Sequence, residues 1–136
     1  MVLALPIAEE LESAAFVAVL QAEDVSSRDT EASKLLDKDD IATVYLYTID
    51  SPLYRQVNEI LRNENRSAAV PYFPFLRRML EALNKLKRQS TILYRGVRTN
   101  LASEYPKGRQ FFWWQFTSCT SHTEVLEESP SANAKG

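Results

Sequence analysis

Two short polar motifs in the second half of the chain could form a ligand site. Arg95 and Gly96 end a run of β-branched and aromatic residues, and residues 118–121, which carry hydroxyl groups and a thiol, end a longer aromatic run. A link rich in turn-forming residues joins the two runs. Strand ends that meet a loop leave backbone and side-chain donors free to contact a ligand. The pattern therefore predicts two strands that bring polar groups to a common cleft.

The cysteine and histidine content argues against metal and thiol chemistry. The chain has one cysteine, Cys119, and one histidine, His122, close together in the same segment. This pair supports neither a zinc site nor a Cys/His nucleophile, so no metal ligand is assigned. A single cysteine rules out an intrachain disulfide and fits a reducing compartment; the cytoplasm is favoured, but no compartment is assigned. Within an aromatic strand, Cys119 is expected to be a small buried side chain.

Length and composition indicate one domain with a hydrophobic core, since 45% of the 136 residues are hydrophobic. A net charge of -2 gives no concentrated cationic face for nucleic acid. The basic residues within 77–88 are expected to form the solvated face of a helix. Glu9, Glu10 and Glu12 interrupt the first apolar stretch and no basic stretch precedes it, which predicts neither a signal peptide nor a membrane span.

Apolar spacing predicts three amphipathic helices before the polar motifs. The first covers residues 6–21, the second covers residues 51–63 and opens with a Ser-Pro pair, and the third starts near Pro74. Residues 22–40 are expected to be a connection with a possible turn around residues 32–36. The side chains predicted to face the core are Leu53, Val57, Ile60 and Leu61 in the second helix and Phe75, Leu76, Met79, Leu80, Leu83 and Leu86 in the third.

Residues 41–48 fit two structures. Val44, Leu46 and Thr48 alternate with other residues as in a strand, whereas the two aspartates before this stretch suit a helix start. Periodicity alone favours the strand.

The pattern from residue 41 to residue 121 resembles the arginine-specific mono-ADP-ribosyltransferases of the R-S-E type. Residues 94–97, YRGV, are similar to the arginine element of that family. Residues 116–121, FTSCTS, are similar to its Ser-x-Ser element, with Cys119 and Thr120 as mild departures. The resemblance implies that residues 41–48 are helical.

The resemblance also implies a fold and a substrate. The fold would be α+β, a partial ADP-ribosyltransferase domain over residues 1–128 with N-terminal helices and the first sheet strands, followed by a disordered polar tail at residues 129–136. The substrate would be NAD. Arg95 would hold the diphosphate with its fork of donors, Gly96 would let the backbone approach the nicotinamide amide, and Ser118 would support the pocket.

The catalytic Glu-x-Glu element of the family does not follow the serine motif in this sequence. Glu124, Glu127 and Glu128 differ from it in spacing and context, and they are expected to be a solvated helix face. No catalytic residue is assigned. The family's reaction modifies an arginine of an acceptor protein, and this chain is expected to be inactive in that reaction. The alternative is a catalytically dead relative that binds NAD or a protein.

The aromatic residues of 111–116 are expected to pack in the core and between sheets. With the sheet only partly built, they would also border an open strand edge. Such an edge predicts self-association.

Overall fold

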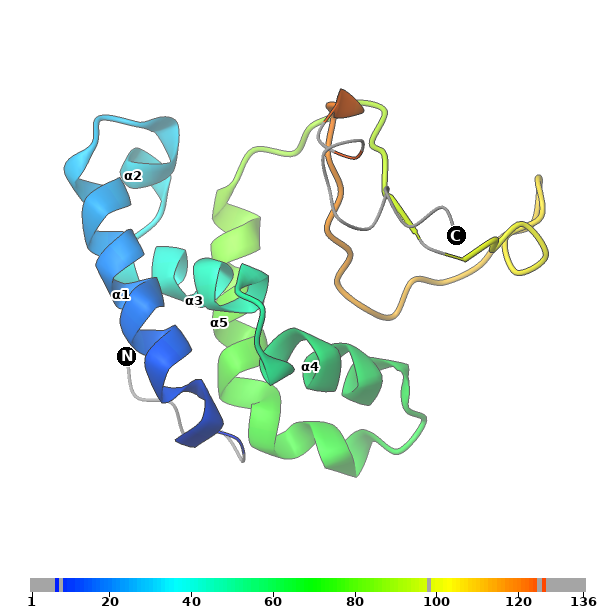
Figure 1. Cartoon of the computed structure of the whole chain (residues 1–136), viewed down its shortest axis with the longest axis horizontal. Coiled ribbons are helices and arrows are strands. Elements are labelled where there is room, and N and C mark those ends of the chain that lie inside the picture. The colour runs from blue at the N-terminus through cyan, green and yellow to red at the C-terminus, as the bar shows by residue number, and fades with distance from the viewer. Residues whose placement is uncertain (1–6, 8, 98, 125, 127–136) are drawn as a thin grey trace. The chain divides into compact units, whose positions relative to one another are not determined.

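A computed structural model of the chain describes residue 7 and residues 9–97, 99–124 and 126. The chain forms two compact units, Met1–Arg88 and Gln89–Gly136, of which the first is helical (Figure 1). None of the helices in the described residues is long and apolar enough to cross a membrane. The extent of the domain proposed for residues 1–128 stays a prediction, and the tail at residues 129–136 lies outside the described residues.

The helical unit is built around α3. Helix α3 contacts both α1 and α5, and Figure 1 shows it between them. Fully buried side chains form the core, among them Leu11, Leu46, Leu53 and Val57. The elements are η1 (Glu9–Leu11), α1 (Glu12–Ser27), α2 (Glu31–Leu35), α3 (Lys38–Thr48), α4 (Pro52–Arg62), η2 (Arg66–Tyr72) and α5 (Phe73–Lys85).

Side-chain caps explain where several of these helices begin. Ser51 caps α4, with its Oγ accepting a hydrogen bond from the backbone N–H of Leu53 at 3.4 Å. Thr30 opens α2 through a capping box with Ser33. Asp37 opens α3 through a capping box with Asp40, in which each carboxylate accepts a backbone N–H of the other residue. Each cap satisfies donors that the first helical turn would otherwise leave unpaired.

The helix predictions are mostly confirmed. The first and second helices form, and residues 41–48 lie in α3 as the family resemblance implied. The expectation of a mere connection over residues 22–40 is wrong, because α1 continues to Ser27 and the Thr30 capping box starts α2. In the third helix Phe75, Leu76 and Met79 are buried as predicted, but Leu80, Leu83 and Leu86 are exposed, because the buried side of α5 continues through Ala82.

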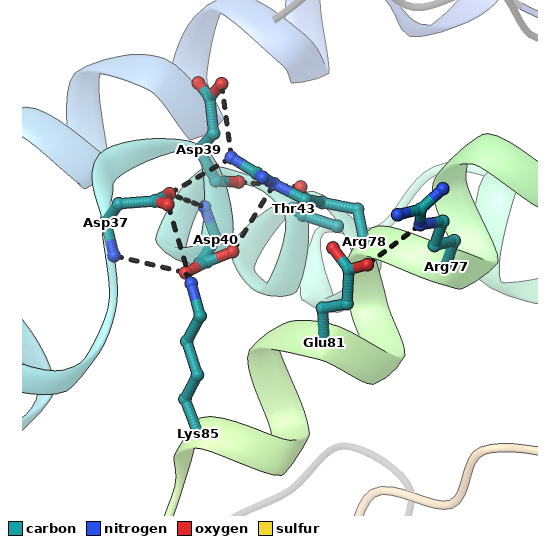
Figure 2. Close-up of polar contacts among 8 residues, drawn as sticks. All are labelled: Asp37, Asp39, Asp40, Thr43, Arg77, Arg78, Glu81 and Lys85. Atoms are coloured by element: carbon teal, nitrogen blue, oxygen red, sulfur yellow. Dashed lines mark hydrogen bonds and ion pairs between the residues drawn. The ribbon is translucent and has the colours of Figure 1, made fainter.

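Charged residues of α5 hold the first turn of α3 (Figure 2). The Asp40 carboxylate is fully buried, accepts a hydrogen bond from Lys85 Nζ and lies 3.3 Å from Arg78 Nε. Arg78 also lies within 3.4 Å of the carboxylates of Asp37 and Asp39. We call these five residues the α3–α5 charge cluster. The basic residues in 77–88 are therefore not simply a solvated face, since Arg78 and Lys85 are ion-paired across the helix interface.

Interactions within the charge cluster shift the pKa values of two of its residues. The backbone hydrogen bond from Asp40 lowers the pKa of Asp37, and the charges of Arg78 and Lys85 act in the same direction. The hydrogen bond to Asp40 raises the pKa of Lys85. Both shifts favour the charged forms that the cluster requires.

The unit Gln89–Gly136 contains one isolated antiparallel bridge, between Tyr94 and Thr120. No longer strand forms within the described residues, so the helical half of the predicted α+β fold is confirmed and the sheet is not. A two-stranded pairing is marginal without a third strand or a packed face. Single-bridge pairing is therefore all that this segment supports by itself.

Aromatic side chains in this unit are exposed, contrary to the prediction that they pack in a core. Phe112 is 83% exposed and Trp114 is 60% exposed. A turn closed by Arg109 N–H donating to Pro106 O, with Gly108 at a φ of 85°, precedes them. Cys119 is also exposed and not buried as expected, because the segment around it has no second layer among the described residues.

Candidate functional site

The Tyr94–Thr120 bridge brings the two polar motifs together. The backbone N–H of Tyr94 donates to Thr120 O at 2.8 Å, and the N–H of Thr120 donates to Tyr94 O at 2.9 Å. In an antiparallel pair the residues after one partner run alongside the residues before the other. Arg95 and Gly96 directly follow one residue of the bridge, and Ser118 and Cys119 directly precede the other. The common cleft and the roles expected there for Arg95, Gly96 and Ser118 stay predictions.

The three residues singled out from the sequence are all accessible. Arg95, Gly96 and Ser118 are exposed. A side chain at Gly96 would place its Cβ 3.4 Å from Leu126 Cδ2, at the edge of ordinary van der Waals contact. The absence of a side chain thus leaves the backbone at Gly96 open to a ligand with Leu126 close beside it.

The hydroxyl of Thr120 has a structural partner. Its Oγ1 accepts a hydrogen bond from the backbone N–H of His122 at 3.1 Å, which is a local turn of the kind that hydroxyl residues form. Sequence reasoning treated this hydroxyl as a preserved part of the serine motif. The structure shows it fixing the end of the bridged segment, directly after Cys119.

Two residues that sequence reasoning did not single out lie just before Ser118. Gln115 Oε1 and Thr117 Oγ1 are buried, and neither has a hydrogen-bond partner among the residues that the structure describes. Residues two apart in an extended segment point to the same side. An unpaired buried oxygen costs free energy, so both atoms are suited to accept a donor. The only sequence signal for Gln115 and Thr117 is that these polar residues alternate with aromatic ones.

Three aromatic side chains cluster around the turn that follows Tyr105. The Tyr105 and Trp113 rings are stacked, with centroids 5.6 Å apart and planes 12° apart. Phe111 meets the Tyr105 ring edge-on at 4.8 Å. Offset and edge-on geometries are those that aromatic pairs prefer. The cluster gives this exposed segment a defined local structure.

One family model, described as NAD:arginine ADP-ribosyltransferase, matches residues 7–133 of the chain. The chain belongs to this family. NAD is the substrate from which the family takes ADP-ribose. Comparison with curated proteins gives no match, and comparison with solved structures gives none either. The suspected family is thereby confirmed, and the match extends beyond the stretch of 41–121 on which the resemblance was noticed.

Of the three carboxylates near the ADP-ribosyltransferase motifs, the structure describes one. Glu124 is exposed, while Glu127 and Glu128 lie outside the described residues. Across the residues that the structure describes, no group of three or more His, Cys, Asp or Glu side chains is arranged to hold a metal ion.

Proposed function

We propose that this chain carries the NAD-binding part of an arginine-specific mono-ADP-ribosyltransferase. The observation that supports the proposal is the Tyr94–Thr120 bridge, because it joins the two segments that carry the family motifs. In the proposed reaction the bond between C1′ of the ribose and the nicotinamide nitrogen breaks, and nicotinamide leaves with the electron pair. A guanidinium nitrogen of the acceptor attacks C1′ and loses a proton to solvent.

Each motif residue has a task in this reaction. Arg95 holds the diphosphate, since a guanidinium offers parallel donors that match phosphate oxygens. Gly96 admits the nicotinamide amide to the backbone, and Ser118 orients the ligand by hydrogen bonding. The acceptor is an arginine side chain of a protein. The second candidate is a relative without catalysis that binds NAD or a protein.

The 136-residue chain is expected to transfer no ADP-ribose to agmatine, a small arginine analogue. No Glu-x-Glu follows Ser121, so no carboxylate is preorganised to stabilise the cationic ribose. Loss of one such group typically costs about 10²–10³ in rate. Incubation with NAD labelled in its adenylate half, followed by chromatography of agmatine, measures the transfer. Labelled agmatine that disappears with Arg95→Ala would contradict the proposed inactivity.

Reading the native transcript past the codon for Gly136 separates the two candidates. A message that continues to a Glu-x-Glu supports the enzyme, and its full product is then expected to label agmatine but not a primary amine such as cadaverine. A message that stops there supports the binding relative. Labelling of cadaverine by the full product would overturn the arginine specificity.

The exposed aromatic segment is expected to make the chain self-associate. Four neighbouring aromatic side chains, Phe111, Phe112, Trp113 and Trp114, are each 47% exposed or more. Exposed apolar surface next to an unpaired edge favours pairing with another chain. Size-exclusion chromatography with light scattering should give a mass above 15.5 kDa. Phe112→Ser should reduce the association, whereas Phe73→Ser, at an exposed aromatic of the helical unit, should not. A single monomer peak for the unaltered chain would contradict this prediction.

A further inference from the structure

Helix α1 is apolar on the side turned away from its own unit. Phe16 is 66% exposed and Leu20, one turn further on, is 48% exposed, with Val17 and Val19 exposed on either side of them. The buried side of the helix is made by Ala18 and Ala22. Helix α1 contacts α3, and Figure 1 shows no other long helix of the unit on its far side. A surface helix normally carries polar residues there, so this apolar strip is unusual.

The charged residues of α1 itself are all acidic. Glu12 lies one turn before Phe16, and Glu23 and Asp24 follow Leu20, all of them exposed. The sequence from residue 1 to residue 27 contains no lysine, arginine or histidine. The nearest basic residue, Arg28, is ion-paired with Asp24. We call Glu12, Phe16, Leu20 and Glu23 the acidic-edged strip; these residues share one face because they recur at three and four positions.

We propose that the acidic-edged strip docks an amphipathic helix whose apolar face is flanked by lysine or arginine. Apolar side chains spaced by one helical turn form a ridge that fits between the side chains of a second helix. The acidic residues at both ends of the strip attract a basic partner, and they fix its register. The partner is thus defined by two features, an apolar stripe and basic flanks.

The acidic residues of the strip favour a basic helix over two other possible binding partners. A second copy of the chain that paired α1 with α1 by a two-fold axis would set acidic ends against acidic ends, which is unfavourable. An anionic membrane surface attracts basic segments and repels acidic ones. A basic amphipathic helix alone satisfies both the apolar strip and its charged edges.

The test measures binding of a fluorescein-labelled helical peptide to the full chain by anisotropy. The peptide consists of alanine, leucine and lysine, with leucines at i, i+3, i+4 and i+7 and lysines beside them. Phe16→Gln combined with Leu20→Gln is expected to weaken binding tenfold or more. Glu12→Lys combined with Glu23→Lys is expected to weaken it by a similar factor and to reduce its dependence on salt. Gln is chosen because it is a good helix former.

A matched variant controls for loss of exposed apolar surface in general. Leu80→Gln combined with Leu83→Gln removes two exposed leucines from α5, and the affinity is expected to stay unchanged. A peptide with glutamate in place of every lysine should not bind. Circular dichroism of each variant checks that the helical unit remains folded.

Three results would overturn the proposal. The first is equal binding of the peptide by the α1 and α5 variants. The second is a concentration-dependent dimer of the unaltered chain that Phe16→Gln abolishes, which would assign the strip to a second copy. The third is a stability loss from Phe16→Gln well above that from Leu80→Gln, which would mean that the chain itself covers the strip.

Discussion

Replacing Asp40 by alanine is expected to lower the free energy of unfolding of the helical unit by about 3 kcal/mol. About 1 kcal/mol comes from the lost half of the α3 capping box. About 2 kcal/mol comes from the lost hydrogen bond to the charged Lys85 and the ion pair with Arg78. The Asp40 carboxylate is fully buried, whereas Arg78 and Lys85 are only partly so. The two cations can therefore turn to water after the substitution, which keeps the loss below that of a wholly buried pair.

The loss is measured by urea denaturation of the full chain, followed by helical circular dichroism. Asp40→Asn is expected to lose less than Asp40→Ala, because asparagine caps a helix about as well as aspartate and removes only the charge. The matched control is Glu81→Ala. Glu81 pairs with Arg77 at 2.8 Å on the exposed side of α5, and such a solvent-exposed pair contributes little to stability. Equal losses for Asp40→Ala and Glu81→Ala would contradict the importance of the charge cluster.

The charge cluster shows what sequence reasoning missed in the helical unit. Arg78 and Lys85 are 41 and 45 residues away from Asp37 and Asp40, the carboxylates that bind them. Charge spacing within one helix gives no information on partners so far along the chain. The local pattern therefore indicated a solvated basic face, and only the packing of α5 against α3 reveals the ion pairs.

Local sequence signals were sufficient to predict a helix whose start and buried face are set by residues within that helix. Helix α4 begins at a Ser-Pro pair and buries Leu53 and Val57, all of which the sequence indicated. Helix α3 contacts helices on two sides, so its apolar residues do not form a single stripe and its period resembles a strand. For α3 the family resemblance gave the right answer where periodicity favoured the wrong one.

The candidate site, too, could be predicted only in part from the sequence. The residue types predicted two strands that bring polar groups to a common cleft, and the Tyr94–Thr120 bridge adds that the two segments pair with each other. Within the described residues neither motif lies in a longer strand, because a two-stranded pair is marginal without a third strand or a packed face, and the motif encodes neither. The buried oxygens of Gln115 and Thr117 were missed because only the three-dimensional arrangement shows which polar atoms lose contact with water.

Replacing Arg95 by alanine is expected to weaken NAD binding by about 10- to 100-fold. The charge-assisted contact of the guanidinium with the diphosphate is expected to contribute about 1.5–3 kcal/mol in all, which corresponds to about this factor. Arg95→Lys keeps the charge but not the fork, so it should weaken binding by a smaller factor. The exposed position of Arg95 means that neither substitution should unfold the chain. Isothermal titration calorimetry of the full chain with NAD measures the affinities.

Nicotinamide riboside distinguishes a phosphate contact from a general effect on the site. This ligand carries no phosphate, so its affinity should be the same for the unaltered chain and for Arg95→Ala. Arg109→Ala, at another exposed arginine of the same unit, is the matched control and should leave NAD binding unchanged. If Arg95→Ala weakens the riboside and NAD equally, Arg95 shapes the cleft and does not bind the diphosphate. If Arg109→Ala weakens NAD as much, the effect is one of net charge, and the role given to the YRG motif fails.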